Sequence, residues 1–173
     1  MPIHLRKKKL GIKNNFVSKI IMKKIYLGAD HRGFKLKENI KNYLDSIKIP
    51  YEDLGAFELD PTDDYPDYAV KVAQKVAEER SRGILICGSA IGVCIVANKF
   101  KGVYAAPVST EQEAMVSMTH NNANVLCLAG WNLSLAKAKK IVRIWLRTEH
   151  KIVVRHERRL AKVKAIENEN FRD

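Results

Sequence analysis

The stretch that decides the fold is Ile84-Leu85-Ile86-Cys87-Gly88-Ser89-Ala90-Ile91-Gly92-Val93-Cys94-Ile95-Val96-Ala97-Asn98-Lys99. It begins with an apolar run of strand length, turns through small residues, and continues as an apolar segment that suits a helix. A helix that starts after such a turn presents unpaired N–H groups and a positive dipole end, and both favour an anion. The pattern predicts an anion site here, because Gly88 and Gly92 let the backbone come close to a ligand.

Cys87 is the last residue of the predicted strand, and this stretch alone is compatible with two interpretations of it. In the first, its sulfur faces a cleft, where the nearby helix start favours the thiolate, the form that accepts a proton. In the second, Cys87 is a buried core residue, which is the commoner fate of an unpaired cysteine. The stretch favours neither interpretation over the other.

Length and composition indicate one globular domain. The chain has 173 residues, of which 46% are hydrophobic, and this is enough for a sizeable core. No apolar run approaches the roughly 20 residues that cross a membrane. The three cysteines form no C-x-x-C pair, which argues against disulfides and a zinc site. We therefore expect a cytoplasmic protein with no membrane contact and no metal.

The net charge of +12 is unevenly distributed along the chain. Residues 1–21 hold six basic residues and no acidic one, which is half of the positive excess. We interpret residues 1–21 as a flexible basic N-terminal extension and residues 22–173 as a single domain. A basic arm can bind nucleic acid. However, the chain shows no nucleic-acid-binding motif and no aromatic platform for bases, so we do not expect such a partner.

Strands and helices alternate in the remaining sequence. The predicted strands are 24–28, 49–54, 84–86, 103–106 and 125–130. The predicted helices are 34–47, 68–82, 93–99, 109–119, 134–147 and 155–169. This order predicts an α/β fold, a three-layer αβα sandwich around a Rossmann-like five-stranded parallel sheet. Right-handed crossovers then place the carboxyl ends of all strands at one edge, where such sheets bind ligands.

Polar residues follow two of these strands. Asp30 and His31 come after the first strand, and residues 87–92 come after the third. His120 is different, because it belongs to a polar, loop-like segment, residues 120–124, that precedes the fifth strand. It would have to reach the cleft from a helix C-terminus, for example that of a neighbouring subunit.

Six motifs in sequence order carry a family resemblance that covers residues 22 to about 169. They are Gly28-Ala29-Asp30-His31-Arg32-Gly33-Phe34, Asp64-Tyr65-Pro66, Cys87-Gly88-Ser89-Ala90-Ile91-Gly92, Ala97-Asn98-Lys99, His120-Asn121-Asn122-Ala123-Asn124 and Arg155-His156-Glu157-Arg158-Arg159. With them the chain resembles the sugar-phosphate isomerases that include ribose-5-phosphate isomerase type B and the galactose-6-phosphate isomerase subunits. Each motif is weak alone, but six in this order are highly specific.

The resemblance implies an intramolecular oxidoreductase of carbohydrate metabolism, in the pentose phosphate pathway. It would interconvert ribose 5-phosphate and ribulose 5-phosphate through an enediolate, without a metal or cofactor. It implies that Cys87 is the base and that His120 opens the sugar ring, with Asp30 nearby. His31, Arg155 and Arg159 would hold the phosphate. The resemblance also implies a homodimer or tetramer whose subunits share their active sites.

The residue types suit this chemistry. The backbone N–H groups of residues 89–92 and the Ser89 hydroxyl can stabilise an enediolate oxygen, and a histidine can both donate and accept a proton. Arg155 and Arg159 lie at i and i+4 on a helix and can clamp a phosphate, although they also fit a solvated helix face. The residues expected to contact the substrate besides the three phosphate-holding ones are Asp30, Tyr65, Gly88, Ser89, Ala90, Ile91, Gly92, Asn121 and Trp131.

Three residues depart from the pattern of the family that the chain resembles. Ala90 replaces the second glycine of a Gly-Thr-Gly turn, while Trp131 and Tyr104 stand where arginines are common. The departures leave two alternatives open: a hexose-phosphate isomerase that acts on galactose or allose 6-phosphate, and a sugar-phosphate-binding protein without turnover. Cys87 and His31 favour the ribose branch, because galactose-6-phosphate isomerase subunits often lack one or both.

Overall fold

Five parallel strands form the single sheet of the computed structural model, which describes residues 23–171. The strands are β1 (Ile25–Ala29), β2 (Tyr51–Asp53), β3 (Arg82–Cys87), β4 (Ala105–Pro107) and β5 (Val125–Ala129), in the order β2-β1-β3-β5-β4. The inner strands β1, β3 and β5 are almost wholly buried, as strands covered on both faces must be. The predicted extension, residues 1–21, lies outside the described residues.

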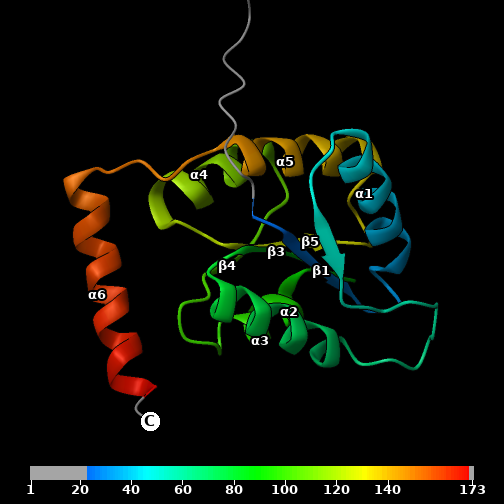
Figure 1. The fold of residues 1–173 in the computed structure, drawn as a ribbon, viewed down its shortest axis with the longest axis horizontal. Coiled ribbons are helices and arrows are strands. Elements are labelled where there is room, and N and C mark those ends of the chain that lie inside the picture. The colour runs from blue at the N-terminus through cyan, green and yellow to red at the C-terminus, as the bar shows by residue number, and fades with distance from the viewer. Residues whose placement is uncertain (1–22, 172–173) are drawn as a thin grey trace, which may run out of the picture.

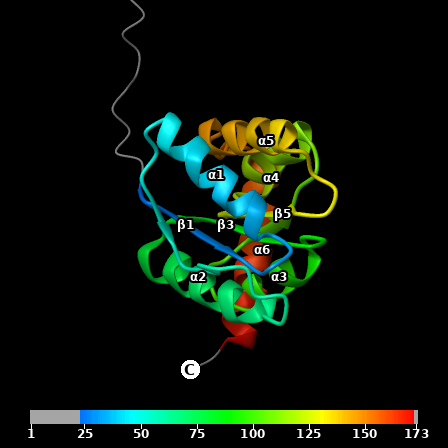
Figure 2. The ribbon, with the colours of Figure 1, turned by 90° about the vertical axis from the view of Figure 1, so that its right-hand side faces the viewer.

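The described residues contain six helices. They are α1 (Phe34–Ser46), α2 (Tyr65–Glu79), α3 (Ile91–Ala97), α4 (Glu111–Asn121), α5 (Leu135–Arg147) and α6 (Val154–Asn170). In Figure 1 and Figure 2, α1, α4 and α5 cover one face of the sheet, and α2 and α3 cover the other. The expected three-layer αβα sandwich is therefore confirmed. None of the described helices is long and apolar enough to span a membrane.

Each face of the sheet has its own hydrophobic core, and β3 contributes to both. Its successive side chains point to opposite faces, as in any strand. Ile84 and Ile86 join the core under α1, α4 and α5, which includes the fully buried Trp145. Leu85 and Cys87 join the core under α2 and α3. The face on which Cys87 lies is thus set by its register in β3.

Among the boundaries that differ from the prediction, two have a clear local cause. The second helix ends at Glu79 instead of continuing to residue 82, because Arg80 adopts a left-handed conformation with φ of 48°. The chain turns there and β3 begins at Arg82. The fourth strand begins at Ala105 instead of residue 103, because the Tyr104 N–H donates to a side-chain oxygen of Asn124.

The segment 120–124 also differs from its prediction as a loop. His120 and Asn121 form the last residues of α4, and Asn122 ends the helix with φ of 49°. Asparagine tolerates this left-handed conformation better than most residues do. His120 therefore belongs to a helix and lies near its C-terminus. This is the position from which we expected it to reach a cleft.

The last helix, α6, stands apart from both layers. Figure 1 shows it running alongside the edge of the sandwich, connected to α5 by an extended segment. His156 is its only buried residue out of 17. A cavity of about 880 Å³ lies between α6 and the rest of the chain, lined by Arg80, Lys101 and Tyr104 on one side and Lys164 on the other. One chain alone therefore covers little of this helix.

Candidate active site

The turns that follow β1, β3 and β5 meet at the carboxyl edge of the sheet. The Asp30 N–H donates to the Ile86 carbonyl at 3.3 Å, and the Gly130 N–H donates to the Cys87 carbonyl at 2.8 Å. These hydrogen bonds join the three turns to one another. The site segments that follow the first and third strands therefore come together, as the parallel order of the sheet requires.

The carboxyl group of Asp30 is buried within the first of these turns. Its side-chain oxygen accepts a hydrogen bond from the Gly33 N–H at 2.9 Å, and the residue is 5% exposed. Burial raises the pKa of the Asp30 carboxyl, an effect that the bond from Gly33 partly opposes. A carboxyl group with a raised pKa at the ligand-binding edge of a parallel sheet is a candidate proton donor or acceptor.

His31 is held by Asp63, a residue that the sequence analysis did not select. One carboxylate oxygen of Asp63 accepts from the His31 backbone N–H at 2.9 Å and lies 2.6 Å from Nδ1 of its ring. Asp63 belongs to the loop of residues 54–64 that joins β2 to α2, and its side chain is 5% exposed. The neighbouring Asp64-Tyr65-Pro66 motif marks this loop, but an aspartate there is equally typical of an ordinary turn.

Two aromatic rings enclose the turn between β3 and α3. A Cβ atom on Gly88 would lie 2.5 Å from the Trp131 ring, and one on Gly92 would lie 2.7 Å from the Tyr65 ring. Only glycine permits such a close approach of a ring to the backbone. Trp131 is 63% exposed and Tyr65 is 38% exposed. Much of each ring therefore remains available to a ligand at this edge.

Ala90 lies inside the same turn and adopts φ of 68°. The backbone is therefore left-handed at residue 90. This is the position where the family that the chain resembles has a glycine and this chain has an alanine. Its methyl group is covered, because Ala90 is 3% exposed and belongs to the core under α2 and α3. The exposed Ser89 hydroxyl accepts from the Ile91 N–H at 3.3 Å, so this donor already has a partner in the chain.

All three cysteines are free thiols and buried. Cys94 and Cys127 belong to the core, as predicted. Cys87 ends β3 as predicted and is 4% exposed, in the same core. Cys87 therefore has one feature of each interpretation. It lies at the ligand-binding edge of the sheet, and it is also a buried core residue. In residues 23–171 no cluster of three or more histidine, cysteine or carboxylate side chains could hold a metal ion.

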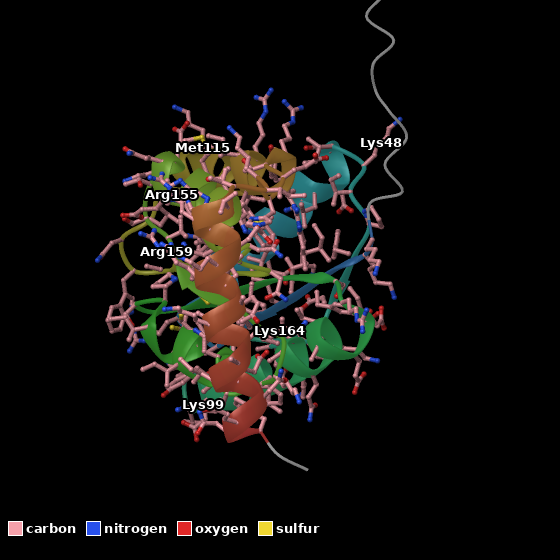
Figure 3. The ribbon with its side chains drawn as sticks, turned by 90° about the vertical axis from the view of Figure 1, so that its left-hand side faces the viewer. Lys48, Lys99, Met115, Arg155, Arg159 and Lys164 are labelled. Carbon is pink, nitrogen blue, oxygen red and sulfur yellow. The ribbon has the colours of Figure 1, made fainter. Side chains whose placement is uncertain are left out.

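The other half of the predicted site lies away from this edge. His120 is in the last turn of α4, which leads into the amino end of β5, whereas Cys87 is at a carboxyl end. Its ring stacks on the His156 ring of α6, with 4.3 Å between centroids. Figure 3 shows Arg155 and Arg159 on α6 beside α4, and both are exposed. One chain does not bring these three residues to Cys87.

The surroundings of His156 favour its neutral form. Its Nε2 accepts a hydrogen bond from the Arg155 side chain at 3.1 Å. Burial lowers the pKa of His156, and the neighbouring His120 and Arg155 lower it further. A neutral His156 can lie beside Arg155 and Arg159 without adding a positive charge to theirs. The asparagine that follows His120, Asn121, is exposed at the end of α4.

Comparisons with known proteins agree with one another. The family model described as Ribose/Galactose Isomerase matches residues 25–163. A probable ribose-5-phosphate isomerase B of Mycoplasma pneumoniae is 43% identical over 146 residues, which cover 84% of this chain and 95% of that protein. D-erythrulose-4-phosphate isomerase 2 of Mycolicibacterium smegmatis is 40% identical over 73% of this chain and 85% of its own length. The crystal structure of ribose-5-phosphate isomerase B from Mycoplasma genitalium with bound ribulose-5-phosphate matches with a TM-score of 0.82 and 41% identity, over 86% of this chain and 99% of that one.

Proposed function

The chain belongs to the ribose/galactose isomerase family, and we propose that it interconverts ribose 5-phosphate and ribulose 5-phosphate as an aldose–ketose isomerase. The observation that carries the proposal is the meeting of Asp30, His31 and the Cys87–Gly92 turn at the carboxyl edge of the sheet. These are motifs that the family resemblance selects, and the neighbouring strands β1 and β3 bring them together. We place the reaction in the cytoplasm, where the three free thiols stay reduced.

Cys87 acts as the base in this proposal. Its thiolate takes the proton from C2 of the open-chain aldose, and the same proton, or one from solvent, returns to C1. The hydroxyl proton moves from the C2 oxygen to the C1 oxygen, so that C2 becomes the carbonyl carbon. The Ser89 hydroxyl and the free N–H groups of the turn stabilise the charge on the enediolate oxygen. The electron pair stays within the substrate, so the proposed reaction needs no external oxidant or reductant.

A second copy of the chain completes the proposed site. His120, Asn121, Arg155 and Arg159 would come from one subunit and Cys87 from the other. This is supported by their separation in one chain, and by apolar side chains left exposed on two helices. Those exposed side chains are Ile91 and Ile95 of α3 and Val154, Val163 and Ile166 of α6. A two-fold dimer would bring each α6 to the carboxyl edge of the partner, so that His120 opens the sugar ring and the arginines clamp the phosphate.

Mixing two inactive variants tests the shared site. Cys87→Ser and Arg159→Ala each remove one half, and a mixed dimer would retain one site with both halves intact. We expect activity to return to about a quarter of the wild-type value after the two are unfolded and refolded together, since half of the dimers are mixed and each has one intact site. No recovery, together with an active monomer in light scattering, would overturn the shared site.

The second candidate is a hexose-phosphate isomerase, and Trp131 is the observation that favours it. Its ring lies over Gly88 at the mouth of the site and is 63% exposed, so it offers an apolar surface to a longer sugar. Coupled assays with ribose 5-phosphate, allose 6-phosphate and galactose 6-phosphate separate the candidates. We expect the largest kcat/KM for ribose 5-phosphate. Binding of sugar phosphates without turnover would instead support the non-catalytic alternative.

A further inference from the structure

We propose that Asp63 is a positioning residue that fixes the His31 imidazole for the substrate phosphate. The inference rests on the proposed function, because it assigns His31 to the phosphate end of the sugar. It concerns a side chain that lies 32 positions along the chain from the histidine it holds. Asp63 itself does not touch the substrate in this proposal and acts only through the ring of His31.

The contact between the two residues defines both the position and the tautomer of the ring. One carboxylate oxygen accepts from the His31 backbone N–H at 2.9 Å and from Nδ1 at 2.6 Å. An ionised carboxylate can only accept hydrogen bonds, so the proton must be on Nδ1. Nε2 has no hydrogen-bond partner among residues 23–171. It is therefore the ring nitrogen that faces a ligand, and it donates to a phosphate oxygen when the ring is an imidazolium.

The loop that carries Asp63 is anchored at its root. Lys37 is fully buried, and its ammonium group donates to both carboxylate oxygens of Asp53 and to the Ala56 carbonyl, each at 2.6 Å. Next to this anchor, the Gly55 carbonyl accepts from the Ala29 N–H at 2.8 Å. The first residues of the loop, directly after β2, are thus hydrogen-bonded to the end of β1, one residue before Asp30. This anchoring fixes where the loop begins, next to the turn that carries His31.

The charge of Asp63 argues for orientation instead of direct attraction. A carboxylate beside a phosphate repels it, so it contributes only when its charge is matched by an imidazolium. Its second oxygen is buried without a hydrogen-bond partner among the described residues, which costs stability. Burial, and then this carboxylate, raise the pKa of the nearby Tyr68 hydroxyl. The chain tolerates these costs at a position whose side-chain hydrogen bonds, among residues 23–171, go to His31 alone.

The test compares Asp63→Asn with Asp60→Asn. Asp60 is in the same loop and its charge also acts on His31, but its carboxylate accepts from Thr62 instead. We expect Asp63→Asn to raise KM for ribose 5-phosphate about tenfold, the loss of one hydrogen bond to a charged group, with kcat changed less than about threefold. Asp60→Asn should leave KM within about twofold. Equal effects of the two variants would overturn the inference.

A double variant tests whether Asp63 acts through His31, and a spectrum tests where the ring proton lies. In the background of His31→Asn, the change Asp63→Asn should have no further effect on KM, and an additive effect would contradict the inference. The ¹⁵N spectrum of the His31 ring should show the proton on Nδ1 in the wild type and lose this signature in Asp63→Asn. Inorganic phosphate should perturb Nε2 only in the wild type. If the wild type fails to isomerise ribose 5-phosphate, the proposed function fails, whereas the spectrum still decides the role of Asp63.

Discussion

The two halves of the candidate site differ in how firmly a single chain holds them. At the carboxyl edge, Asp30 and Cys87 are 5% and 4% exposed, and hydrogen bonds join the three turns. On α6, Arg155 and Arg159 are exposed and only His156 is buried. A single folded chain therefore forms the first half, whereas it leaves the second half exposed on α6.

The difference follows from what positions each half. Turns at the ends of buried parallel strands inherit the rigidity of the sheet, because neighbouring strands fix the start of every turn. α6 has no such neighbour on most of its surface, although it exposes Val154, Val163 and Ile166. Apolar side chains on a charged helix are typical of a contact with another chain. In the proposed function, Cys87 would therefore come from one chain, whereas His120, Arg155 and Arg159 would complete its site only from a second copy.

The largest expected effect is the loss of turnover in Cys87→Ser. This variant tests whether the half of the site at the carboxyl edge provides the catalytic base. Replacement of a thiol by a hydroxyl removes the general base, which is worth about 10²–10⁴ in rate. The free energy of unfolding should change little, because serine has a similar shape. The measurement is exchange of the substrate C2 proton with solvent deuterium.

Cys94→Ser is the matched control, since Cys94 is also buried in the same core but donates to the Ala105 carbonyl inside the fold. It should lose some stability and little exchange. Wild-type exchange in Cys87→Ser would show that another residue is the base.

The next largest effect is expected at Lys37, whose buried ammonium group binds Asp53 and Ala56 beside the first half of the site. Lys37→Met should lower the free energy of unfolding by about 3 kcal/mol or more, because it leaves a buried carboxylate short of a partner. Lys41→Met should lower it by about 1 kcal/mol or less, because Lys41 bonds the same carboxylate from a partly exposed position. Denaturant titration of both variants measures the difference, and equal losses would contradict the prediction.

The same pair predicts a pH dependence. Burial raises the pKa of the Asp53 carboxyl, but the hydrogen bonds from Lys37 and Lys41 outweigh it and the net pKa is lowered. A carboxyl whose folded-state pKa is lowered contributes stability above its unfolded pKa of about 4 and loses it as the pH falls through the folded value. The wild type should therefore lose stability below about pH 4, and Lys37→Met should lose less.

The sequence predicts the first half of the site better than the second. Alternating strands and helices are local patterns, and parallel order then determines that Asp30, His31 and Cys87 share one edge. The pairing of Asp63 with His31 joins a loop to a turn 32 residues away, and no local pattern encodes it. The stack of His120 on His156 depends likewise on how α6 returns to α4. The end of α2 was missed because arginine gives no sign of the left-handed conformation that Arg80 adopts.

A smaller effect is expected at Trp131, where the two halves would meet. Trp131→Arg adds a guanidinium at the carboxyl edge. In the proposed site, the only other guanidinium groups that bind the phosphate are those of the arginines of α6. A charge-assisted bond to phosphate is worth about 1.5–3 kcal/mol, so KM for ribose 5-phosphate should fall by about tenfold or more. An unchanged or raised KM would indicate that the clamp on α6 already neutralises the phosphate. Trp131→Leu serves as the control for loss of the ring.

The smallest effect is expected from Ala90→Gly, because three contributions nearly cancel. Glycine relieves the left-handed conformation at φ of 68°, worth about 1–2 kcal/mol. It also removes a buried methyl group, worth about 0.8 kcal/mol, and makes the unfolded chain more flexible by about 0.4–1 kcal/mol. The free energy of unfolding should therefore change by less than about 1 kcal/mol.

The control for this cancellation is Ala97→Gly in α3, where alanine is equally buried but helical. There the methyl group and the helix propensity are both lost without any relief, so stability should fall by about 2 kcal/mol. The difference between the two variants measures what the left-handed alanine costs the turn. If both lose the same stability, Ala90 is not strained, and the rigidity of the carboxyl edge comes from the packing of Trp131 and Tyr65 on Gly88 and Gly92 alone.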